Sequence, residues 1–185
     1  MIKGWLNTTI TPERFLENYV STGDKVNITK LVERFNLSIY HYLLSLSDKE
    51  TAEDTLQTTW LKVIKVQSTT KHHTNVKSWL YTIARNTLID ELRRQQKWQL
   101  QTLEPDHLKS DLLDQELEKT TRLEIFNSAI SKLPFYQREV FIFQQEGFSV
   151  GEISELTNES FETTKSRLRY ARNNLKAMLG KYYER

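Results

Sequence analysis

Apolar residues recur at three- and four-residue spacing along most of this chain, and this helical periodicity limits the folds that it can adopt. The longest such stretch runs from Val26 to Leu46, where the apolar residues at core spacing are Ile28, Leu31, Val32, Phe35, Ile39, Tyr42 and Leu43. The 185 residues contain only 5 Gly and 3 Pro, so few positions interrupt a helix. The pattern therefore predicts an all-α protein.

The periodic segments form two groups separated by a polar stretch. The first group is expected as helices beginning at Thr11-Pro12 and spanning 26–46, 49–66 and 76–98. The second group is expected over 117–133, 135–145, 150–156 and from Ser160 onward. Between them the periodicity weakens, and residues 101–131 hold 3 basic and 7 acidic side chains. We therefore predict two small helical domains, 1–98 and 116–185, joined by an acidic linker over 99–115.

Composition argues against several classes of protein. The chain has no cysteine, so it has no disulfide and no thiolate ligand or nucleophile. No apolar run approaches the length of a membrane span, and no export signal is apparent, so the protein is expected in the cytoplasm with no membrane partner. His72-His73 could bind a metal, but a plain surface loop is the preferred interpretation. We find no catalytic constellation, and we expect neither enzyme activity nor a cofactor.

The run from Ser160 to Lys176 is a basic amphipathic helix. It carries five cations and no acidic residue after Glu162, while an apolar stripe occupies its other face: Leu168, Ala171 and Leu175. A short helix precedes it across the turn Thr157-Asn158-Glu159, which makes a helix-turn-helix. The alternative is a charged helix face that serves only solubility, and the spacing favours nucleic acid.

Several motifs in order along the chain resemble the extracytoplasmic-function (ECF) sigma factors of bacterial RNA polymerase. In the first half they are Ala52-Glu53-Asp54 with Gln57 and Trp60, and the run from Trp79 to Asn86 followed by Ile89-Asp90 and Arg93-Arg94. In the second half they are Leu133-Pro134 with 137–141, Glu152-Ile153, and Thr163, 165–168 and Ala171-Arg172. The turn departs from the family pattern at Thr157, Asn158 and Glu159. The resemblance implies the family's regions 2 and 4, with the helix-turn-helix in region 4.

The resemblance implies that the domain with the basic helix meets the −35 promoter element. Residues near the start of a recognition helix face the base edges and later ones face phosphates. The predicted −35 residues are therefore Glu162, Thr163, Lys165, Arg167, Arg169 and Arg172. For Glu162 the alternative is an acid that only stabilises the helix dipole.

The resemblance implies that the helix at 76–98 binds the −10 element, and aromatic stacking with cationic backbone contacts is suited to holding its single strand. The predicted −10 residues are Trp79, Tyr81, Arg85, Asn86, Arg93 and Arg94. The preceding loop, with Lys71, His72, His73 and Asn75, matches the place where the family binds a flipped-out base. Trp79 is equally compatible with a core position, and Asp90 could pair with Arg94 instead of contacting DNA.

The resemblance assigns Glu53, Asp54, Gln57 and Trp60 to binding of the polymerase clamp, although a solvated helix face is the alternative for the acids. The expected partners are core RNA polymerase, promoter DNA and, as often in the family, an anti-sigma factor. The second hypothesis is a helix-turn-helix regulator that binds duplex DNA without polymerase. It explains residues 133–179 and leaves the N-terminal motifs unused.

Overall fold

A computed structural model describes residues 10–65, 75–102 and 122–183, although the side chains of 97–102 and 181–183 are not described. Within these ranges the chain forms eight α-helices and no strand. The predicted all-α class is therefore confirmed for the described residues. The helices are α1 (Pro12–Thr22), α2 (Lys25–Leu46), α3 (Lys49–Ile64), α4 (Val76–Thr102), α5 (Arg122–Ser131), α6 (Phe135–Gln145), α7 (Val150–Thr157) and α8 (Phe161–Tyr183).

Side-chain caps fix the starts of the N-terminal helices. The Thr11 hydroxyl accepts a hydrogen bond from the Arg14 backbone N–H, and Pro12 occupies the first turn of α1. The Asp48 carboxylate accepts from the Thr51 N–H at 2.8 Å and begins α3. These contacts satisfy backbone donors that the first turn of a helix leaves unpaired. The predicted start at Thr11-Pro12 is confirmed.

Turn residues of the expected types divide the C-terminal helices. Pro134 separates α5 from α6, and Gly147 follows α6 with φ of +87°, a backbone region that glycine enters without steric cost. Ser149 and Glu152 form a reciprocal capping box at α7, with the Ser149 N–H donating to the Glu152 carboxylate at 2.9 Å. The Ser160 hydroxyl accepts from the Thr163 N–H at 3.0 Å, which confirms the predicted start of α8.

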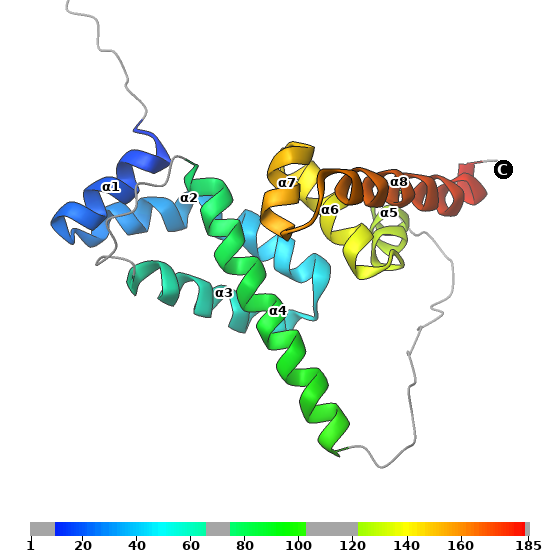
Figure 1. The fold of residues 1–185 in the computed structure, drawn as a ribbon, viewed down its shortest axis with the longest axis horizontal. Coiled ribbons are helices and arrows are strands. Elements are labelled where there is room, and N and C mark those ends of the chain that lie inside the picture. The colour runs from blue at the N-terminus through cyan, green and yellow to red at the C-terminus, as the bar shows by residue number, and fades with distance from the viewer. Residues whose placement is uncertain (1–9, 66–74, 103–121, 184–185) are drawn as a thin grey trace, which may run out of the picture.

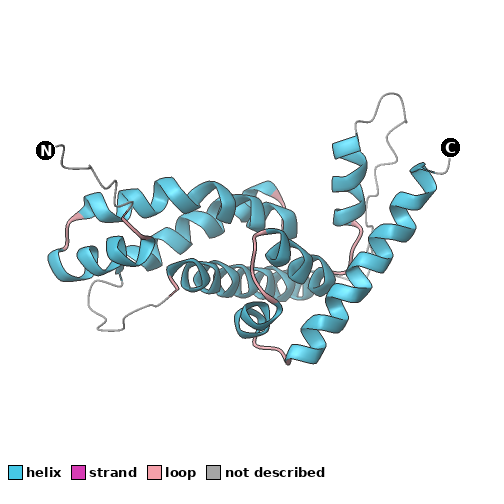
Figure 2. Ribbon diagram, turned by 90° about the horizontal axis from the view of Figure 1, so that it is seen from above, coloured by secondary structure: helices cyan, strands magenta, loops and turns pink. Residues whose placement is uncertain are grey.

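One continuous apolar core spans both halves of the chain. Its buried members come from α1 to α4 and also from the C-terminal half, namely Val140, Phe143, Phe148, Ile153, Leu156 and Leu168. Figure 1 shows α4 lying between the N-terminal helices and the α6–α7 pair, and α2 also contacts α6. A smaller cluster around Leu133 and Leu175 joins α5, α6 and α8, and α8 extends away from α1–α3 (Figure 2). The two predicted domains therefore pack together through side chains that periodicity alone assigns to separate cores.

The boundaries of the predicted linker shift at its N-terminal end. Helix α4 continues to Thr102, four residues beyond the expected end, so 99–102 are helical. The rest of the predicted linker lies outside the described residues, as does the start of the helix expected at 117. The division into 1–98, 99–115 and 116–185 stays a prediction.

Candidate functional site

The first turn of α8 presents a polar and aromatic surface to solvent. Glu162 and Lys165 are exposed, and Thr163 is half-buried with its hydroxyl 2.8 Å from that of Ser160. Phe161, the first residue of the helix, is 51% exposed, although its ring is large and apolar. Sequence reasoning did not single out Phe161, because one apolar residue beside a predicted cap is easily taken as a core contact.

The turn before α8 accommodates its unusual residues. Asn158 adopts the left-handed conformation at φ of 54°, which asparagine tolerates better than most residues. Thr157 is buried, and its hydroxyl donates to the Ile153 carbonyl at 2.7 Å, so this hydroxyl is not left unpaired. Glu159 pairs with Arg167 at 2.9 Å. The sequence departures therefore remain compatible with a helix-turn-helix.

The arginines of α8 divide into two environments. Arg167 is only 23% exposed, because Glu159 holds its guanidinium, which also lies 4.7 Å from the ring centre of Tyr136. Arg169 and Arg172 are exposed. Arg172 donates to the side-chain oxygen of Gln144 at 2.7 Å, which directs it along the outer face of α6. Among the arginines predicted to contact the −35 element, Arg169 and Arg172 are accessible, whereas Arg167 is paired with Glu159 of the turn.

The predicted −10 residues also divide into two sets along α4. Asn86, Arg93 and Arg94 are exposed, whereas Tyr81 is fully buried and the Arg85 side chain is 12% exposed. The Asn75 side-chain oxygen accepts from the Ser78 N–H at 2.9 Å and begins α4. Lys71, His72 and His73 lie outside the described residues.

Trp79 and Asp90 were each given two interpretations from sequence. Trp79 is half-buried against the shared core, which fits a core position and leaves part of the ring accessible. Asp90 is exposed and does not pair with Arg94 as suggested. Arg94 pairs instead with Glu91 at 2.8 Å, because residues three apart are also neighbours on a helix.

Arg85 and Tyr81 face acidic residues of α6 and the turn that follows it. The Glu139 carboxylate accepts from Arg85 Nε at 2.8 Å, from a terminal Arg85 nitrogen at 3.2 Å, and from the Tyr42 hydroxyl at 3.4 Å. The Tyr81 hydroxyl donates to the Glu146 carboxylate at 2.7 Å. The sequence motifs mark Arg85 and Glu139 only separately, so their pairing required the tertiary structure.

Burial dominates the ionisation of this cluster. It raises the pKa of Glu139 above its usual value, against the opposing effect of the hydrogen bonds and charge of Arg85. Burial also raises the pKa of Tyr42 strongly, and the nearby Glu139 charge adds to this shift. Burial likewise raises the pKa of Tyr81, and its hydrogen bond to Glu146 adds to the rise. Both phenols therefore stay protonated and act as donors.

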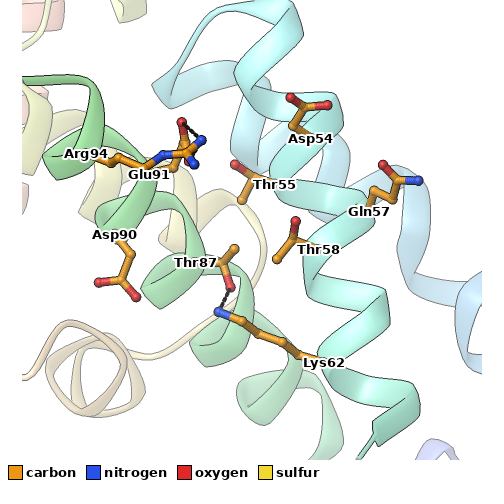
Figure 3. A pocket seen from close by; sticks show the side chains of 9 residues that line it. All are labelled: Asp54, Thr55, Gln57, Thr58, Lys62, Thr87, Asp90, Glu91 and Arg94. Carbon is orange, nitrogen blue, oxygen red and sulfur yellow. Dashed lines mark hydrogen bonds and ion pairs between the residues drawn. The ribbon is translucent and has the colours of Figure 1, made fainter. Parts of the chain in front are cut away.

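A cleft of about 510 Å³ lies between α3 and α4 (Figure 3). The predicted polymerase residues Asp54 and Gln57 line it from α3, and Asp90 lines it from α4. In its wall the Lys62 ammonium donates to the Thr87 hydroxyl at 2.9 Å. Polar groups of both helices therefore converge on one open surface.

The four residues predicted for polymerase binding do not share one environment. Glu53, Asp54 and Gln57 are exposed. Trp60 is 8% exposed and belongs to the core, with its indole N–H donating to the Asn36 side chain at 2.8 Å. Trp60 lies eight residues after Ala52 and three before Val63, both fully buried, so it belongs to the inward stripe of α3 and anchors the helix in the core.

Comparison with known proteins identifies the family. Residues 31–98 match the family model Sigma-70 region 2, and residues 123–175 match Sigma-70, region 4. The fold and these matches define a sigma-70 type factor with both regions in order. The chain is 30% identical over 160 residues to ECF RNA polymerase sigma factor SigM of Bacillus subtilis, covering 83% of this chain and 95% of that one. It is 28% identical over 164 residues to RNA polymerase sigma factor YlaC of the same organism, covering 85% and 95%.

The chain belongs to the ECF sigma factors, in the sigma-70 family. It is therefore an RNA polymerase sigma factor, a non-enzymatic protein that binds the polymerase and directs promoter-specific transcription initiation.

Two solved structures share the fold. The sigma factor RpoE in complex with the anti-sigma factor NepR from Bartonella quintana aligns with a TM-score of 0.70 at 26% identity, covering 85% of this chain and 98% of that one. CnrH in complex with the cytosolic domain of CnrY aligns with a TM-score of 0.65 at 20% identity, covering 92% of this chain and 99% of that one. At this identity the likeness shows a shared fold only. In the described part of this chain, no helix has the length and apolar character needed to cross a bilayer.

Proposed function

We propose that the two halves of this sigma factor divide promoter recognition, with α8 reading the −35 element and α4 binding the −10 element. The observation that supports the division most directly is the distribution of exposed cations. Arg169 and Arg172 project from α8, while Arg93 and Arg94 project from the far half of α4. Two separate cationic surfaces fit a promoter contacted at two places.

At the −35 element, the exposed first turn of α8 would enter the major groove. Glu162 can accept a hydrogen bond from a cytosine amino group, and Lys165 can donate to guanine. Arg169 and Arg172 would contact phosphate. Arg167 supports this surface indirectly, since its pair with Glu159 fixes the turn that orients α8.

At the −10 element, Asn86, Arg93 and Arg94 are the accessible residues of the predicted set. Cationic groups would follow the backbone of the displaced strand, and the accessible part of Trp79 would stack on a base. Tyr81 and Arg85 belong to the same helix, but the contacts that they make with α6 and the following turn must be released before either can bind DNA.

For polymerase binding, we propose the outer face of α3 with the adjoining cleft. Asp54 and Gln57 offer acceptors and donors there that no intramolecular hydrogen bond in the described structure occupies. Trp60 acts by holding α3 in the core and does not touch the partner. Because the polymerase and the chromosome are the targets, the protein is proposed to act in the cytoplasm.

The test is initiation with core polymerase at a promoter identified by mapping transcription start sites after overexpression. The double variant Arg93→Ala/Arg94→Ala should keep −35 protection and lose permanganate reactivity of the −10 strand. The double variant Asp54→Ala/Gln57→Ala should bind polymerase more weakly while its DNA-binding C-terminal half is unaffected. A protein that binds its duplex site equally well without polymerase, and does not co-elute with it, would instead be a stand-alone regulator.

A protein partner is also proposed. Two structural relatives were solved with an anti-sigma factor or the cytosolic domain of a second protein. We propose that an anti-sigma factor likewise controls this chain. Co-purification of the tagged protein from its own cells, followed by release of transcription when the captured partner is deleted, would support it.

A further inference from the structure

Two large aromatic side chains are exposed on the described part of α8, and they lie on opposite flanks of the helix. Phe161 and Tyr170 are each 51% exposed. They are nine positions apart, which is about two and a half turns of an α-helix, so the two flanks differ. The Arg169 guanidinium covers the Tyr170 ring, 5.2 Å from its centre. Phe161, by contrast, belongs to neither apolar cluster of the described structure.

The position of Phe161 on the helix connects it with the cations of α8. Single exposed apolar residues are common on protein surfaces, so exposure alone does not identify a contact. Residues four apart on a helix are neighbours, and residues eleven apart return to the same face after about three turns. Phe161 therefore lies in line with Lys165 and Arg172, which are both exposed. An apolar ring thus begins a row whose later members are cations proposed to contact a base and a phosphate.

The chemistry of the ring limits what it can recognise in the major groove. Phe161 is the first residue of α8, and residues at this end of a recognition helix face the base edges. The ring has no hydrogen-bond donor or acceptor for the polar groups of a base edge. Thymine, however, presents an apolar C5 methyl group to the major groove, and phenylalanine is among the side chains that contact it. Covering the ring and the methyl group together removes apolar surface of both from water, which favours binding.

We propose that Phe161 is a specificity-determining residue that recognises the methyl group of a thymine in the −35 element. This inference rests on the proposed −35 role of α8 and adds the contact by which one base is selected. Uracil pairs with adenine as thymine does but lacks the methyl group, so only an apolar contact distinguishes the two. Covering one methyl group corresponds to a difference of about fourfold in affinity.

The test uses holoenzyme reconstituted from core polymerase and the full chain, on a promoter identified by mapping transcription start sites. Each thymine of the −35 region, on both strands, is replaced in turn by deoxyuridine, which keeps the base pair and removes only the methyl group. Competition binding should show that wild-type holoenzyme binds about fourfold more weakly at one of these replacements. Holoenzyme with Phe161→Ala should bind the unmodified promoter about as weakly, and should lose no further affinity at that replacement.

Two further variants separate the methyl contact from other effects of the substitution. The matched control is Tyr170→Ala, which removes an aromatic ring of equal exposure from the opposite flank of α8. Its ratio of affinities for the thymine and uracil promoters should equal the wild-type ratio. Phe161→Leu keeps an apolar side chain and should retain most of the thymine preference. Thermal denaturation of the three variants should stay close to that of wild type, because both positions are exposed.

The outcomes distinguish this inference from the proposed function. Methyl recognition by Phe161 is overturned if wild-type holoenzyme binds every uracil-substituted promoter as tightly as the unmodified one. It is also overturned if the thymine preference persists in Phe161→Ala, or if Tyr170→Ala abolishes it. The −35 role of α8 itself fails only if base-pair substitutions throughout the −35 region, and Arg172→Ala, leave promoter binding unaltered. A promoter that responds to base-pair substitution but not to removal of any thymine methyl group would therefore contradict this inference alone.

Discussion

Replacing Phe143 with alanine should destabilise both halves of the protein together. Phe143 is fully buried on α6, and its ring contacts those of Tyr42, Tyr81 and Phe148 at centre distances of 4.8, 6.1 and 5.7 Å. Removal of a buried phenylalanine ring costs about 3–5 kcal/mol of unfolding free energy. The ring lies where both halves meet, so we expect the upper part of that range.

The tryptophans make the expected coupling measurable. All four lie at or before position 98, at 5, 60, 79 and 98, so tryptophan fluorescence reports on the N-terminal half alone. With a urea m-value of about 2 kcal/mol per molar, the fluorescence midpoint of Phe143→Ala should fall by about 2 M. Far-UV circular dichroism should give the same midpoint, because one shared core unfolds in one transition.

The matched control is Phe161→Ala, which removes the same ring from a position that is 51% exposed and should change stability by less than about 0.5 kcal/mol. The reasoning would be refuted if circular dichroism of Phe143→Ala showed an early partial transition while the fluorescence midpoint stayed at the wild-type value. That result would mean that the halves unfold independently and that Phe143 stabilises only the C-terminal one.

Four further predictions concern a cap, a turn and two arginines of α8. Hydrogen bonds from Thr51, the one from its backbone N–H above all, lower the pKa of Asp48, so the stabilisation from this cap is present above the unfolded-state pKa and is lost as the pH falls through the folded-state pKa. Urea titrations across acidic pH should show this loss of unfolding free energy. Asp48→Ala should cost about 1 kcal/mol near neutral pH and abolish this pH dependence. Asn158→Ala should lower the unfolding free energy by about 1 kcal/mol because its φ is positive, whereas Asn158→Gly should leave it nearly unchanged or raise it, as thermal denaturation can show. Arg172→Ala should weaken promoter-duplex binding and reduce the salt slope by about 1, as expected for a lost phosphate contact, and an unchanged slope would remove Arg172 from the interface. Arg167→Ala should instead lower thermal stability, since Arg167 is paired with Glu159, and equal stability with a reduced slope would show that it contacts DNA.

Much of the local structure follows from the sequence because caps, turns and apolar periodicity act over a few residues. The helix at Phe135–Gln145 was expected with the bounds that α6 has, and Gly147, Ser160 and Thr11-Pro12 act at helix ends as their residue types indicate. The family motifs, which are also local, led to the sigma-factor assignment. Of the predicted site residues, Asp54, Arg93 and Arg172 are exposed, as their positions on polar helix faces indicate.

What the sequence left open depends on partners far along the chain. Trp60 belongs to the same motif as Gln57, yet its indole is bonded to Asn36 and faces the core. Arg85 shares a motif with Asn86, but Glu139, 54 residues away, receives its guanidinium. Periodicity identifies an apolar helix face but does not indicate which element packs on it. Likewise, the sequence around a cation in a motif does not indicate which acidic residue pairs with it. The tertiary structure therefore decided which cations are accessible and joined the two predicted domains around one core.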